Sequence, residues 1–298
     1  MKKFIIVTDS CSDLTKDVRE QFDIDYIPMH MMVEGKEYFA DIDFNDINYK
    51  DFYKILRDGT RITTAQITAY EFTQKFEEYI ANGNDVLYIS CSSALSASIK
   101  ASCVARDELL NKYPDAKIIC VDSLNSCFGL GNLCCAASEM RKEGKTIEET
   151  AAWLEANKLK SHQVCTVESL TYLKRAGRVS AAKAFFGGLL NKKPIIISDA
   201  VGQNHAVETV KGRRASMEKI AEKMFENYED IEYQRVVVCD ADDDNAADEL
   251  QATIEAKFGD KKLEIVRGKI GPIIGASAGP GTVAVYFLGK EVTINKPE

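Results

Sequence analysis

The sequence is short of the residues and motifs on which catalysis, metal binding and redox chemistry usually depend. It has only 3 histidines, and its 9 cysteines include no Cys-x-x-Cys pair that could bind zinc or exchange disulfides. A Walker phosphate loop is absent, so ATP hydrolysis by this chain alone has no support. With no sign of export, the cysteines are expected to be reduced thiols, mostly in the core. We therefore expect no metal ion and no cofactor.

Long hydrophobic runs and concentrated positive charge are also missing. The apolar stretch near the N-terminus ends at Asp9 after a few residues, which is too short for a signal peptide or a membrane span. Lys and Arg total 38 against 46 Asp and Glu, a net charge of -8, and no segment has the basic face that binding of nucleic-acid phosphates needs. We expect a cytoplasmic protein with no nucleic-acid partner and no stable membrane insertion, which binds a small molecule or another protein.

The length of 298 residues and the order of apolar patterns predict a two-domain α/β protein. Strand-like runs alternate with helical patterns, and the motif Thr-x-x-Glu predicts the start of a helix over 146–158. The strand and helix series then restarts at 162–167. We predict a domain over 1–160 with a mostly parallel sheet flanked by helices, and a smaller α/β domain over 161–298 with a mixed sheet. The predicted strands lie at 4–7, 85–90, 117–121, 194–198, 235–240, 263–266 and 282–287, and further helices at 215–228 and 246–258.

Three hydroxyl-rich segments adjoin predicted strands or helices, at residues 8–13, 61–68 and 90–98, and the second is predicted to be a loop before a helix that starts near Tyr70. The first and third follow a strand, which places them at the carboxyl edge of the sheet, where α/β proteins bind ligands. Hydroxyls and free amides at such turns favour an anion. Helix capping, for example by Ser12 or Asp13, explains 8–13 equally well, and it is the better interpretation of each of the other two segments taken alone.

Two further segments have the composition of binding turns or loops. Residues 173–180 form a basic turn before an apolar stretch at 181–190, and a basic group there could bind a buried anion. Residues 270–281 are glycine-rich and contain Gly-x-Ser-x-Gly around Ser277, but Pro280 opposes a following helix and neither Asp nor His follows the serine. We therefore predict a loop without a nucleophile. The acidic runs 41–46 and 240–245 lack the glycine and glutamate of a calcium loop and are interpreted as solvated loops and helix caps.

Together these segments resemble the DegV family in order and spacing. Each motif is short, but their joint order is much more specific than any one of them. The matching motifs span nearly the whole chain: Thr8-Asp9-Ser10, Thr64-Ala65-Gln66, Ser92-Ser93-Ala94-Leu95-Ser96, Val121-Asp122-Ser123, residues 173–180, Lys193-Pro194-Ile195 and residues 271–281. The resemblance implies two α/β domains that hold one long-chain fatty acid in a buried tunnel.

The resemblance also implies roles for particular residues and for a partner. By motif position, Thr64 and Ser96 would bind the carboxylate of the fatty acid. Family members act as carriers for a separate fatty acid kinase subunit, which phosphorylates the bound carboxyl group for phospholipid synthesis. Ser277 stands where the family usually has a histidine, a departure that bears on kinase coupling more than on lipid binding. Further residues expected in the pocket are Ser10, Ser93, Arg178 and Ser277.

Two other functions remain open at this point. The chain could be a lipid-responsive regulator without kinase coupling, which the serine at 277 favours. It could instead be an enzyme on a small acyl or phosphorylated substrate, with Ser96 or Ser277 as nucleophile, although no histidine lies in a matching motif to act as the base.

Overall fold

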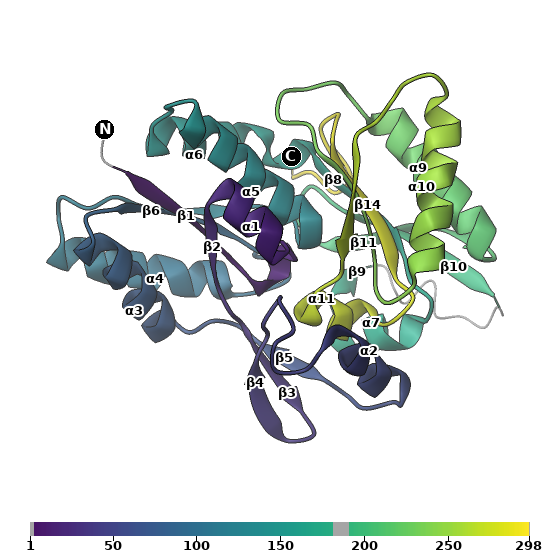
Figure 1. Cartoon of the computed structure of the whole chain (residues 1–298), viewed down its shortest axis with the longest axis horizontal. Coiled ribbons are helices and arrows are strands. Elements are labelled where there is room, and N and C mark those ends of the chain that lie inside the picture. The colour runs from purple at the N-terminus through teal and green to yellow at the C-terminus, as the bar shows by residue number, and fades with distance from the viewer. Residues whose placement is uncertain (1–2, 181–190, 298) are drawn as a thin grey trace.

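A parallel sheet of four strands forms the centre of the first half of the chain (Figure 1). The structure is a computed structural model that describes residues 3–180 and 191–297. The strand order is β2-β1-β6-β7, and all neighbours run parallel. The strands are β1 (Phe4–Asp9), β2 (Ile24–Ile27), β6 (Asp85–Ser90) and β7 (Ile118–Asp122). Their carboxyl ends therefore lie at one edge of the sheet, next to the second half of the chain.

Helices cover both faces of this sheet (Figure 1). One layer contains α3 (Ala69–Ala81) and α4 (Ser98–Lys112), which pack against each other. The opposite layer contains α1 (Lys16–Phe22), α5 (Cys127–Lys142) and α6 (Ile147–Asn157). Thr146 and Glu149 form the capping box expected at the start of α6. A one-turn 3-10 helix, η1 (Ser10–Ser12), follows β1, and another, η2 (Lys158–Lys160), follows α6.

The second half is built on a mixed sheet of seven strands in the order β13-β12-β14-β8-β10-β11-β9. The pairs β12–β13 and β11–β9 are parallel, and the other pairs are antiparallel. Helices α9 (Arg213–Asn227) and α10 (Asp244–Phe258) pack on one face. The strands are β8 (Ser161–Thr166), β9 (Val179–Ser180), β10 (Lys192–Ser198), β11 (Asn204–Lys211), β12 (Val236–Asp240), β13 (Ile265–Lys269) and β14 (Val283–Leu288).

Because side chains alternate along its strands, the second sheet has a different hydrophobic core on each face. On β12, Val236 and Val238 belong to the core under α9 and α10, whereas Val237 and Cys239 belong to the core shared with the first half. Successive side chains on a strand point to opposite faces, so a strand with both faces buried is apolar throughout. The first half of the chain therefore packs on the sheet face that α9 and α10 leave open.

A third, three-stranded sheet projects beside the junction of the two halves (Figure 1). It contains β4 (Lys36–Phe39), β3 (His30–Val33) and β5 (Thr63–Ala65), in that order and all antiparallel. Three short helices lie close to it: α2 (Tyr49–Arg57), α7 (Leu170–Ala176) and α11 (Pro272–Ala278).

The α/β fold class, with a parallel sheet in the first half and a mixed sheet in the second, is confirmed. Two local predictions are wrong. Residues 270–281 were expected to form a loop but contain α11, which begins with Pro272 in the first turn, where the missing amide hydrogen costs nothing. The threonine-rich segment 61–68 was also expected to be a loop but contains β5. The apolar stretch predicted at 181–190 lies outside the described residues.

The predicted division at 160/161 coincides with the start of β8 at Ser161, but a separate domain at each side stays a prediction. The acidic run at 240–245 is less solvated than expected, because Asp240 is fully buried and its carboxylate accepts a hydrogen bond from Lys269 Nζ at 2.9 Å. Asp243 caps α10, as anticipated. Within the described ranges, no helix is long and apolar enough to cross a membrane.

Candidate functional site

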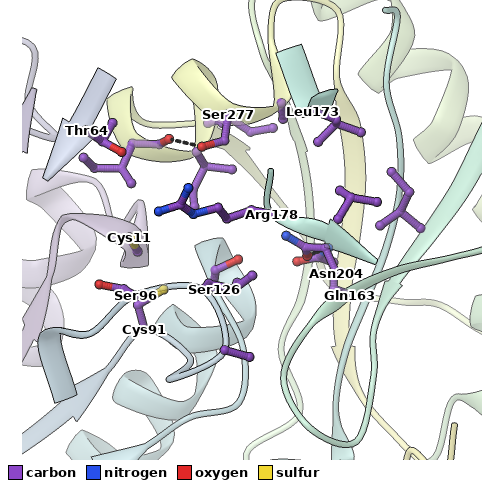
Figure 2. A pocket seen from close by; sticks show the side chains of 18 of the residues that line it. Cys11, Thr64, Cys91, Ser96, Ser126, Gln163, Leu173, Arg178, Asn204 and Ser277 are labelled. Carbon is purple, nitrogen blue, oxygen red and sulfur yellow. Dashed lines mark hydrogen bonds between the residues drawn. The ribbon is translucent and has the colours of Figure 1, made fainter. Parts of the chain in front are cut away.

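A cavity of about 440 Å³ lies between the two halves of the chain. This size falls within the roughly 300–1,000 Å³ that is common for small-molecule sites. Its walls come from the carboxyl edge of the parallel sheet, from β5, from the inner face of the mixed sheet and from α11 (Figure 2). The apolar lining residues include Met29, Leu95, Val167, Leu173, Val179, Ile196, Ile270, Ile273 and Ile274.

Strand alternation turns the Thr64 side chain toward this cavity. Thr64 pairs with Met31, which is buried, so the two side chains share the inner face of the small sheet. Its neighbours Thr63 and Ala65 are more exposed, and Thr63 does not line the cavity. The Thr64 hydroxyl makes no hydrogen bond with any described residue. It is thus an uncommitted donor and acceptor at the cavity wall.

Ser96 reaches the cavity from the turn between β6 and α4. The Ser96 amide donates to the Ser92 carbonyl at 2.9 Å, which closes the turn. Its hydroxyl oxygen accepts from the Ser98 amide at 3.2 Å and lies 3.0 Å from the Ser98 hydroxyl oxygen. Ser96 therefore stands at the N-terminus of α4, where the helix dipole and free amides favour negative charge. Ser93 from the same turn also lines the cavity.

Arg178 and Ser277 are the other two predicted site residues that line this cavity. Gly177 ends α7 with a positive φ of 66°, and the chain then turns so that Arg178 enters the cavity between its two sides (Figure 2). Arg178 Nη1 donates to the Ala176 carbonyl at 2.6 Å. The Ser277 hydroxyl donates to the Ile273 carbonyl of its own helix at 3.2 Å (Figure 2).

Ser10 does not line the cavity. It is fully buried, its hydroxyl donates to the Ala40 carbonyl at 2.7 Å and accepts from the Met29 amide at 2.9 Å. These bonds hold the end of β1 to the residues that precede β3 and follow β4. Both hydrogen-bonding functions of the hydroxyl are already used by the fold, which leaves Ser10 a structural role.

Asp9 holds together two loops of the cavity wall, a role that the sequence motif did not reveal. Its carboxylate accepts from the amides of Cys11 and Cys91 at 2.9 Å each. Tyr88 Oη also donates to it at 2.9 Å. Burial raises the pKa of Asp9 although these hydrogen bonds act in the opposite direction. The carboxyl group thereby holds the two loops whose thiols line the cavity.

The Cys11 and Cys91 thiols are buried in the cavity wall (Figure 2). The pKa of the Cys11 thiol is raised, mainly by a hydrogen bond with Cys91 and secondly by burial. The thiol is therefore protonated at neutral pH and acts as a small apolar wall group.

None of the three histidines lines this cavity. His162 belongs to β8 and stacks on Phe287, a residue of the core under α9 and α10, and burial lowers its pKa. His30 contacts Glu71 and Glu37 at the small sheet. Ser277 and Ser96 thus have no histidine base beside them, and no cluster of three or more potential metal ligands occurs in residues 3–180 and 191–297.

The sequence analysis missed the polar lining residues Ser126, Gln163, Asn204, Thr282 and Tyr286. Each is an isolated polar residue in or next to an apolar element, so no local motif marks it. Their common location became visible only through the fold.

Comparison with known proteins gives a consistent family assignment. The family model described as "Uncharacterised protein, DegV family" matches residues 3–290. A DegV domain-containing protein of Clostridium perfringens is 38% identical over 289 residues, which are 97% of this chain and 98% of that protein. A DegV lipid-binding protein of Thermotoga maritima is 26% identical with a TM-score of 0.84, covering 98% of this chain and 100% of its own. A fatty-acid-binding DegV family protein of Thermus thermophilus is 26% identical with a TM-score of 0.85, covering 97% and 100%.

Proposed function

Because this chain belongs to the DegV family, we propose that it binds one long-chain fatty acid in the cavity between its two halves. The observation that carries the proposal is the cavity itself, which combines apolar walls with hydroxyls and a guanidinium near one side. The similarity to the lipid-binding protein of Thermotoga maritima and the fatty-acid-binding protein of Thermus thermophilus supports it.

The carboxylate would be held by Thr64 and Ser96, with Arg178 as a charged neighbour. A buried carboxylate costs several kcal/mol unless hydrogen bonds or an opposite charge compensate. The Thr64 hydroxyl is uncommitted, and Ser96 stands at the start of α4. Arg178 is the single charged residue among the described residues that line the cavity. These groups would stabilise the negative charge of the head group at the side where Figure 2 shows Thr64 and Ser96.

The acyl chain would run from these groups along the apolar walls. One face of α11 supplies Ile273, Ile274 and Ser277, at the spacing of residues on one side of a helix. Leu173 of α7 and Ile196 of β10 also line the cavity. Each buried methylene contributes about 0.8 kcal/mol, so an apolar tunnel can bind a long chain tightly with few polar contacts.

The chain would act as a carrier that presents the carboxylate to a separate fatty acid kinase subunit. It would not catalyse phosphoryl transfer itself, because its sequence has no Walker loop and the cavity has no histidine. We place the protein in the reducing cytoplasm, a location supported by its nine free cysteines. Ser277→His should change acyl-phosphate formation with the kinase subunit more than it changes fatty-acid affinity.

A regulator without kinase coupling is a second candidate, favoured by the bonding of Ser277. Its hydroxyl donates to Ile273 in its own helix, so α11 offers no charged donor to the head group. The coupled assay separates the two functions. Acyl phosphate formed with wild-type protein supports the carrier, whereas tight binding without any acyl phosphate supports the regulator.

Isothermal titration calorimetry of delipidated protein with stearic acid tests the proposal. We expect saturable binding with about one acid per chain, because one cavity combines the polar and apolar groups required. Thr64→Val and Ser96→Ala should weaken it. Absence of binding to any long-chain acid would refute the proposal.

A further inference from the structure

A second group of polar side chains lines the cavity, and Figure 2 shows two of them, Gln163 and Asn204, on the side away from Thr64 and Ser96. Ser126 precedes α5, Gln163 lies on β8, and Tyr286 lies opposite Gln163 on β14. The residues are 3%, 5% and 2% exposed, respectively. Asn204, at the start of β11, adjoins them. We call Ser126, Gln163 and Tyr286 the inner polar cluster.

The inner polar cluster has unused hydrogen-bonding capacity. Gln163 Nε2 donates to Asn204 Oδ1 at 2.9 Å, which fixes the orientation of the amide. Gln163 Oε1 accepts one hydrogen bond, from the Tyr286 hydroxyl, and its length of 3.5 Å is at the limit for such a bond. The other neighbour of the Tyr286 hydroxyl is the Cys127 thiol, a weak hydrogen-bonding group. The Ser126 hydroxyl makes no hydrogen bond with any described residue.

An unsubstituted acyl chain would leave these groups facing methylenes. Buried polar groups without good partners cost about 1–3 kcal/mol each, so a ligand atom that bonds to them gains free energy. A hydroxyl group suits this place, because it can donate to Gln163 Oε1 and accept from Tyr286 or Ser126. A carboxylate suits it less, because the inner polar cluster is neutral and a buried charge needs an opposite charge.

We propose that the inner polar cluster recognises a hydroxyl group carried within the acyl chain, so that the preferred ligands are hydroxylated long-chain fatty acids. This inference rests on the proposed function and names the ligand class of the same cavity. Thr64 and Ser96 would bind the carboxylate, and the inner polar cluster would select the substituent and its position along the chain.

Calorimetric titration with stearic acid and a set of monohydroxylated stearic acids, with the hydroxyl moved along the chain, tests the proposal. At least one positional isomer should bind about three- to tenfold more tightly than stearic acid, the ratio for one net hydrogen bond. Tyr286→Phe and Ser126→Ala each remove one hydroxyl from the cluster. The preference should shrink in at least one of these variants, because the variant loses a partner for the ligand hydroxyl and no longer buries an unpaired hydroxyl against the chain of stearic acid.

Ser102→Ala is the matched control. It removes a buried hydroxyl that donates to the Ile99 carbonyl at 2.8 Å inside α4, outside the cavity lining, and should keep the full preference. Equal or weaker binding of every hydroxylated isomer to the wild-type protein would overturn the inference but leave the proposed function standing. So would a preference retained in full by both cluster variants. Failure of all acids, stearic acid included, would overturn the proposed function and the inference with it.

Discussion

Replacing Thr64 with valine isolates the proposed head-group contact with little effect on the fold. Valine has nearly the same shape and keeps the β-branched side chain that suits β5. The Thr64 hydroxyl bonds to no described residue, so the folded protein without ligand loses no hydrogen bond. A hydrogen bond to a charged group contributes about 1.5–3 kcal/mol. Thr64→Val should therefore weaken fatty-acid binding roughly tenfold to a hundredfold, at an unchanged melting temperature of the delipidated protein.

The same strand supplies the control. Thr63 precedes Thr64 and is exposed on the outer face of the small sheet, so Thr63→Val makes the same chemical change away from the cavity. Calorimetric titration with stearic acid and with stearyl alcohol would measure both variants. The loss in Thr64→Val should be larger for the acid, because the alcohol carries no charge. Wild-type affinity in Thr64→Val, or an equal loss in Thr63→Val, would refute the assignment of the head group.

Three more predictions concern the site and its surroundings. Ser96→Ala should also weaken fatty-acid binding, by about 1.5–3 kcal/mol in a titration if its hydroxyl bonds to the carboxylate, and unchanged affinity would remove Ser96 from the site. Ser277 should stay unlabelled by a fluorophosphonate probe, since no histidine lines the cavity, and mass-spectrometric detection of a Ser277 adduct would revive the hydrolase interpretation. Burial is the main reason why the pKa of Asp13 is raised well above its ordinary 3.8, so the native state holds its proton longer than the unfolded state. The contribution of Asp13 to stability is complete below its ordinary pKa and falls as pH rises toward the native pKa. The melting temperature of Asp13→Asn should therefore rise relative to that of the wild type from about pH 5 to about pH 8. The exposed Asp46→Asn is the control, and a constant difference between wild type and Asp13→Asn across that range would contradict the cause.

The sequence was informative where a local pattern has one dominant structural meaning. The capping box at Thr146 and Glu149 located α6, and the apolar run at 85–90 located β6. The three strands of the small sheet have 4, 4 and 3 residues, too few for a periodic pattern to stand out.

Helix α11 shows why composition misled the prediction over 270–281. Glycine and proline normally mark loops, but here tertiary packing outweighs local preference. A Cβ on Gly275 would lie 2.6 Å from Tyr53 Oη and 3.0 Å from Phe52, so glycine allows α11 to pack closely against α2. The composition that suggested a loop therefore reflects the tight fit of a helix.

The candidate site was predictable only in part. Thr64, Ser93, Ser96, Arg178 and Ser277 follow from motif order, and the structure brings all five to one cavity. Ser10 has a motif but is committed to bonds with Ala40 and Met29. The inner polar cluster had no motif, because its members come from β8, β14 and the turn before α5, which only the folded chain brings together.

The most direct test of the central claim is mass spectrometry of the protein purified from cells, first intact under native conditions and then after organic extraction. We predict a long-chain fatty acid, about one per chain, since one cavity between the two halves combines apolar walls with the proposed carboxylate-binding groups. The claim would be contradicted by protein that is consistently empty and also fails to take up added fatty acids, or that carries a nucleotide or sugar phosphate instead.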